Sequence, residues 1–132
     1  MNETDEKLSA IVTALHRLQT EGQEDAYCIF TASIAKNYYI QFSGSSAERK
    51  LYAEAVSNRF LEETHTLNAQ KLTALTRLGW LFDPQEAPNF YRIFEADSDD
   101  DRADIAKIVL QTLVEIYGLQ IDQPLIVNVT LG

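Results

Sequence analysis

The sequence has few of the residues on which most catalytic and cofactor sites depend. It contains one cysteine, two histidines and five glycines among 132 residues. The single Cys28 has no partner for an internal disulfide bond, and we do not expect a metal site built on thiolates. His16 and His65 belong to no HExxH motif and stand beside no conspicuous Ser or Cys nucleophile, so structural or solvated roles are expected for both.

Nucleotide-binding loops are also missing. The patterns GxGxxG and GxxxxGK[ST], whose backbone amides hold phosphates, do not occur. The four internal glycines stand where a helix or a turn is expected to end: Gly22, Gly44, Gly79 and Gly118. We therefore expect no cofactor and no catalytic residue.

One acidic run imitates part of a metal site. Asp97, Asp99 and Asp101 follow the spacing of the first ligands of a calcium loop. However, Arg102 stands where that loop needs glycine and Ile108 where it needs a bidentate glutamate, which excludes an EF-hand. Capping and solvation of a following helix are the favoured roles, with a weak adventitious metal site as the alternative, and we expect no bound metal.

Positive charge is scarce and scattered. Eleven Lys and Arg face twenty Asp and Glu, which gives a net charge of -9 and argues against binding to nucleic acid or to an anionic membrane. No apolar signal core is present at the N-terminus, and no uncharged run reaches the roughly 18 residues that span a bilayer. These absences predict a cytoplasmic protein. The acidity is explained by solubility or by a basic or aggregation-prone client.

What is present is a pattern of short amphipathic elements. Hydrophobic residues make up 45 % of the chain, enough for one core. Helical spacing predicts a first helix near 4–20, a second after a cap at Asn68 and a third after the acidic segment 97–104. Strand composition marks 26–34, 38–42, 51–57, 89–95 and 125–131.

This order of elements predicts the fold class. The chain should form a single α+β domain over residues 1–132, in the order α-β-β-β-α-β-α-β, with helices on one face of an antiparallel sheet. Leu51, Ala53 and Ala55 should face the core, leaving Tyr52, Glu54 and Val56 on the other side. The last strand could pair parallel or lie at an edge.

Several tyrosines fall on the predicted strands. If Tyr39, Tyr52 and Tyr91 gather on the face opposite the helices, they form an amphipathic surface suited to a peptide or a second subunit. The alternative is that they are the scattered tyrosines of an ordinary antiparallel sheet. We take these three residues as the candidate partner-binding site.

The chain resembles the type III secretion chaperone-like superfamily, and within it the YbjN-related group of small peptide-binding-chaperone-like domains. The residues that carry the resemblance span about two thirds of the chain: Glu54-Ala55-Val56-Ser57-Asn58, Leu61, Leu72, Leu75, Leu78-Gly79-Trp80, Pro84, Asn89, and Leu113 through Tyr117-Gly118. The matching residues Ser57, Asn58, Gly79 and Trp80 are carried over only as determinants of the fold.

The resemblance implies a non-enzymatic chaperone-like or adaptor protein that forms a homodimer and grips an extended segment of a client protein or peptide. The second helix or the outer sheet face would form the interface. One departure is the predicted strand 125–131, where the secretion chaperones end in a helix; this strand could cover an edge that a client would use. A small-molecule-binding or enzymatic domain with a pocket between sheet and helices is the alternative.

Overall fold

The computed structural model describes residues 2–132. Three α-helices are interspersed with five strands: α1 (Glu3–Glu21), β1 (Tyr27–Ser33), β2 (Tyr38–Ser43), β3 (Lys50–Ala55), α2 (Ala69–Arg77), β4 (Phe90–Glu95), α3 (Asp99–Glu115) and β5 (Ile126–Thr130). Two short 3₁₀ helices, Asn58–Phe60 and Glu63–His65, connect β3 to α2. The observed order is the predicted one, and the α+β class is confirmed.

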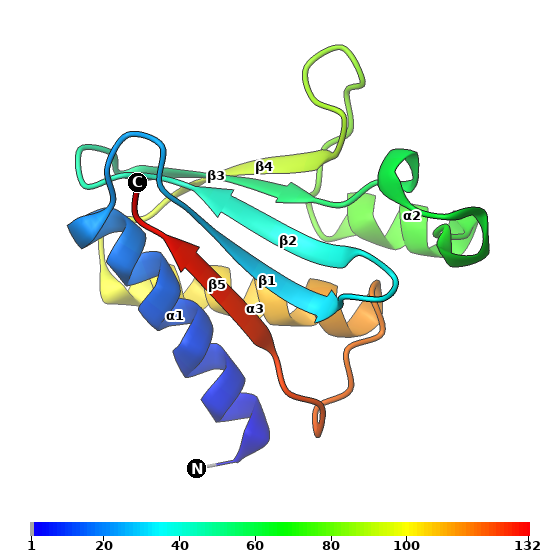
Figure 1. The fold of residues 1–132 in the computed structure, drawn as a ribbon, viewed down its shortest axis with the longest axis horizontal. Coiled ribbons are helices and arrows are strands. Elements are labelled where there is room, and N and C mark those ends of the chain that lie inside the picture. The colour runs from blue at the N-terminus through cyan, green and yellow to red at the C-terminus, as the bar shows by residue number, and fades with distance from the viewer. Residues whose placement is uncertain (1) are drawn as a thin grey trace.

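The five strands form one antiparallel sheet in the order β4-β3-β2-β1-β5 (Figure 1). The pairing of the last strand, which the sequence left open, is therefore decided. β5 lies antiparallel to β1 at one edge, with Cys28 opposite Val129 and Phe30 opposite Val127. β4 lies at the other edge.

Helices α1 and α3 pack together on one face of this sheet, and none of the helices in residues 2–132 covers the other face (Figure 1). Alternation along the strands sends every second residue to the covered face, where Phe30, Ile40 and Leu51 are fully buried. They meet the apolar side of α1, including Ile11 and Leu15, in one contiguous core. The two-layer arrangement leaves the tyrosine-bearing face open.

Local capping explains where the helices begin and end. The side chains of Asn2, Asn68 and Ser98 accept hydrogen bonds from backbone N–H groups in the first turns of α1, α2 and α3. After α2, Gly79 adopts a φ of 94°, the left-handed conformation expected of it. The N–H of Trp80 then donates to the carbonyl of Leu75 at 3.0 Å, which folds the chain back against the helix end.

One expectation for the third strand was wrong. Val56 was expected on the outer face, but it is fully buried. β3 ends at Ala55, so the alternation that would expose Val56 does not continue, although its N–H still donates to the carbonyl of Tyr39 at 3.2 Å. The two 3₁₀ helices that follow were not predicted, because three-residue turns have no periodicity to detect.

Candidate functional site

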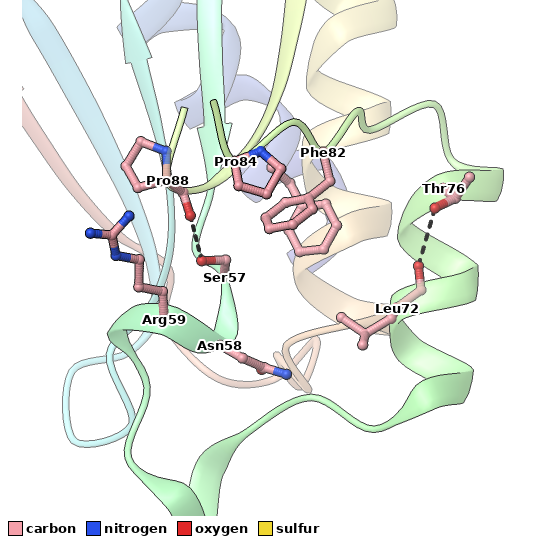
Figure 2. Close-up of a pocket in the computed structure, with 9 residues that line it drawn as sticks. Ser57, Asn58, Arg59, Leu72, Thr76, Phe82, Pro84 and Pro88 are labelled. Atoms are coloured by element: carbon pink, nitrogen blue, oxygen red, sulfur yellow. Dashed lines mark hydrogen bonds between the residues drawn. The ribbon is translucent and has the colours of Figure 1, made fainter. Parts of the chain in front are cut away.

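An apolar pocket of about 430 Å³ opens at the end of the sheet, between α2 and the segment 82–90 (Figure 2). Three separate parts of the chain form its walls: the turn after β3, the exposed side of α2 and the loop before β4. The residues that line it are Ser57, Asn58, Arg59, Leu72, Thr76, Phe82, Pro84, Pro88 and Phe90. We call this cavity the α2 pocket.

Ser57 ties two of these walls together. Its backbone N–H donates to Oδ1 of Asn89 at 2.9 Å, and its hydroxyl donates to the carbonyl of Pro88 at 2.7 Å. Both Ser57 and Asn89 are buried, where unmade hydrogen bonds would be costly. The pair therefore holds the chain leaving β3 against the chain entering β4.

Asn58 positions the third wall. Its amide Nδ2 donates to the carbonyl of Leu67 at 3.1 Å, and its Oδ1 accepts from the N–H of the same residue at 2.6 Å. These two bonds hold residue 67 one step before the cap residue of α2. Ser57 and Asn58 were expected to be fold determinants. Their hydrogen bonds give this role a physical basis, because they hold together the segments that form the walls of the pocket.

The lining of the α2 pocket is mainly apolar. Phe82 and Phe90 pack with ring centroids 4.9 Å apart, and two prolines continue the apolar surface. Phe82 is 52 % exposed, so its ring is available to a partner. Arg59 is the one charged residue in the lining. Such a pocket can bind an apolar side chain and place a cation at its rim.

The predicted tyrosines lie on the open face of the sheet, but only two of them stack. The rings of Tyr52 and Tyr91 are nearly parallel, with centroids 6.3 Å apart and an interplanar angle of 16°. Tyr39 stands outside this stack, and its hydroxyl accepts a 3.4 Å hydrogen bond from Nδ2 of Asn89. Tyr39 instead borders a second hollow of about 380 Å³ over β1 and β2, beside Ile34.

Two carboxylates lie close enough to Tyr52 for their charges to act on its phenol. Burial raises the pKa of Tyr52 above its ordinary value, and the charges of Glu54, Tyr91 and Glu86 act in the same direction. The phenol of Tyr52 is therefore neutral at physiological pH. It presents an aromatic surface with negative carboxylates close by.

The acidic run forms the start of α3, which begins at Asp99 and not after residue 104 as expected. The carboxylate of Asp101 accepts from the N–H of Asp97 at 2.9 Å, and Asp99 pairs with Nη2 of Arg102 at 2.7 Å. This contact with Arg102 lowers the pKa of Asp99. Within residues 2–132, no three His, Cys, Asp or Glu side chains are arranged to hold a metal ion.

The sequence carried a partial signal for the α2 pocket. Four of its lining residues, Ser57, Asn58, Leu72 and Pro84, are among those that carry the resemblance. Phe82 and Pro88 were missed as site residues, since each lies in a loop whose position depends on distant partners. Core side chains pack between the sheet and helices α1 and α3, and a hollow of about 400 Å³ opens between α1 and β5.

A bare sheet face and an apolar pocket are the candidate binding surfaces of this small α+β protein. Comparison of the sequence with known families identifies its family. The chain belongs to the family described as T3SS (YopN, CesT) and YbjN peptide-binding chaperone 3, TY-Chap3, which matches residues 5–129. The resemblance found in the sequence is confirmed.

Comparison with curated proteins and with solved structures gave no match. Among the helices of residues 2–132, none combines the length and the apolar character that crossing a membrane would require.

Proposed function

We propose that this protein is a non-enzymatic, chaperone-like binder of a client polypeptide. Membership in a peptide-binding chaperone family supports this role. The observation that carries it is the α2 pocket, an apolar cavity of about 430 Å³ whose wall includes the half-exposed ring of Phe82. Such a cavity accommodates a large apolar side chain of a partner and removes it from water.

The client segment would anchor in the α2 pocket and contact the open sheet face, where Tyr39, Tyr52 and Tyr91 are the proposed partner-binding residues. Tyrosine suits this task because its rigid ring provides contact area while its hydroxyl accepts or donates a hydrogen bond. The residues 1–132 would act as one domain, in the cytoplasm and as a homodimer. Its second subunit would use α2 or the outer sheet face.

A displayed library of random twelve-residue peptides, selected on the immobilised full chain, tests this function directly. Binding of the enriched synthetic peptides is then measured by fluorescence anisotropy. Thr76→Trp places a bulky ring at an exposed position that lines the pocket. We expect this variant to weaken peptide binding at least about tenfold, because the cavity is filled.

Thr73→Trp is the matched control. Thr73 is exposed on the same helix but does not line the pocket, so this variant should bind like the original chain. Circular dichroism establishes that both variants keep the fold. Failure to enrich any peptide, or equal binding by both variants, would contradict the proposed role of the pocket.

A further inference from the structure

Tyr52, Tyr91 and Glu54 form a compact group on the open face of the sheet. Tyr91 lies directly opposite Glu54 in the pairing of β3 with β4, and Tyr52 precedes Glu54 by two residues on the same face of β3. The carboxylate of Glu54 therefore adjoins both rings of the stacked pair. Because directly opposed and alternate residues of a sheet are side-chain neighbours, this grouping follows from register alone.

Residues 2–132 supply no ion-pair partner for the negative charge of this group. Neither Glu54 nor Glu86, a second carboxylate whose charge acts on Tyr52, forms an ion pair there. The residue opposite Glu54 on its other side is Gln41, which is uncharged. Lys50, on the same face of β3, stands four residues from Glu54 and opposite another carboxylate, Glu95.

Exposed apolar side chains border the same group. Leu81 pairs with Tyr91 through two 2.9 Å backbone hydrogen bonds and is 54 % exposed. Ile93 lies opposite Tyr52 and is 59 % exposed. The surface therefore alternates between apolar contact area and uncompensated negative charge.

We propose that Tyr52, Tyr91 and Glu54 form a subsite that binds an arginine side chain of the client segment. This inference rests on the proposed function and adds the chemical character of the client. A planar guanidinium can lie on the rings of the tyrosine pair and donate hydrogen bonds to the carboxylate of Glu54 at their edge. Leu81 and Ile93 would contact apolar residues that flank the arginine.

Charge complementarity favours this occupant over others of similar size. An acidic or phosphorylated segment would meet Glu54 and Glu86 in an acidic protein of net charge -9 and would be repelled. A wholly apolar segment would leave both carboxylates partly desolvated without a partner. A basic segment with flanking apolar residues satisfies both kinds of surface.

The probe is the synthetic peptide Ac-Gly-Leu-Arg-Val-Gly-amide, titrated into the ¹⁵N-labelled full chain and followed by NMR. Its partner peptide carries citrulline, which has the shape of arginine without the charge. We expect the arginine peptide to bind about five- to tenfold more tightly, the combined effect of a cation over exposed rings and a partly exposed ion pair. Amide shifts should centre on residues 52–54 and 91.

Two double variants separate a local effect from a general effect of charge. E54Q/E86Q removes both carboxylates and should reduce the preference for arginine to less than about twofold. E24Q/E115Q removes the same charge at exposed positions elsewhere and should keep the preference. Y52L/Y91L keeps apolar bulk but loses the rings, and it should also reduce the preference for arginine. Circular dichroism checks that all three double variants fold normally.

The inference is overturned if the two peptides bind alike, or if E24Q/E115Q loses the preference as fully as E54Q/E86Q. That result would leave the proposed function intact, since it depends on selected peptides and on the effect of Thr76→Trp. The opposite result is also distinguishable. If the library selection enriches no peptide but the NMR titration still shows a preference for arginine at residues 52–54, the client-binding role is contradicted and the subsite is not.

Discussion

Trp80 joins the chain after α2 to the helix layer. Its ring is 1 % exposed, and its Nε1–H donates to the hydroxyl of Thr112 on α3 at 3.1 Å. We expect Trp80→Ala to lower the free energy of unfolding by about 3–5 kcal/mol, because it empties a large buried volume. Urea unfolding followed by circular dichroism measures this change, and a loss below about 1 kcal/mol would refute the assignment.

Thr112→Val removes the acceptor of the same contact, together with the bond that the hydroxyl donates to the carbonyl of Ile108. Valine keeps the volume of the buried Thr112 but leaves the indole N–H without its acceptor. The expected loss is about 1–3 kcal/mol, the cost of an unsatisfied buried donor. Trp80→Ala removes the indole donor. Thr112→Val should therefore lower the free energy of unfolding less in the Trp80→Ala background than in the original chain.

Gly79 is constrained by conformation and by a neighbour at once. Its φ is 94°, and a Cβ built on it would lie 2.7 Å from Nη1 of Arg92, which itself donates to the carbonyl of Leu78. Gly118 also has a positive φ, of 74°, but a Cβ there would meet nothing within 4 Å. Gly118→Ala should therefore lose only the backbone term of about 1–2 kcal/mol, and Gly79→Ala clearly more.

Thermal and urea unfolding of these two alanine variants make the comparison. Gly79→Val should be worse than either, since a β-branched residue resists the left-handed region further. Equal losses at Gly79 and Gly118 would mean that Arg92 moves aside freely. In that case the contact of a Cβ at Gly79 with Arg92 would contribute nothing to the loss of stability.

Cys28 gives the stability a dependence on alkaline pH. Burial raises the pKa of its thiol from 9.0 to about 12, so the unfolded chain loses this proton first. The contribution of the thiol to stability is complete below pH 9 and declines as the pH rises from 9 toward 12, by up to about 1.4 kcal/mol per pH unit.

Cys28→Ala should therefore show a shallower fall in unfolding free energy between pH 9 and pH 10 than the original chain. Tyrosine ionisation is common to both proteins and cancels in the comparison. Parallel pH curves would show that the thiol titrates alike in the folded and unfolded states.

At the scale of elements, α2 depends on its surroundings more than α1 or α3 does. It has nine residues and one buried side chain, Leu75, and helices this short are unstable alone. Asn58 holds the segment before it and Arg92 caps the carbonyl of Leu78 after it, at 2.7 Å. The wall of the α2 pocket is therefore an element of low local stability.

Hydrogen exchange should show this directly. We expect amides of α2 to exchange through local opening, at a lower free energy than amides of β1 and β2. Asn58→Ala removes both bonds to Leu67 and should accelerate exchange in α2 while leaving the strands nearly unchanged. Protection of α2 equal to that of the central strands would contradict this account.

The elements of this fold differ, for a physical reason, in how far their positions follow from the sequence alone. The helices and strands were predicted because periodicity and caps such as Asn68 act within a few residues. The pairing of β5 with β1 joins positions about a hundred residues apart, and no local signal specifies it. The α2 pocket needs three distant segments, so its residues were recognised only where the family resemblance included them.

For the whole molecule, the dominant feature is a net charge of -9, which acts on every encounter between two copies. The proposed homodimer must bury apolar surface against this repulsion. Salt shortens the screening length from about 10 Å at 0.1 M to about 3 Å at 1 M. We therefore expect the dissociation constant of the dimer to fall as salt is raised, which sedimentation equilibrium measures.

Two substitutions identify which surface the dimer uses. Ile93→Lys places charge on the outer sheet face at a residue that is 59 % exposed, and Thr73→Lys does the same on the exposed side of α2. Because neither side chain belongs to the core, folding should be unaffected. An outer-face dimer is dissociated by the first substitution only, and an α2 dimer by the second only. A chain that is monomeric at micromolar concentration in both low and high salt would reject the dimer altogether.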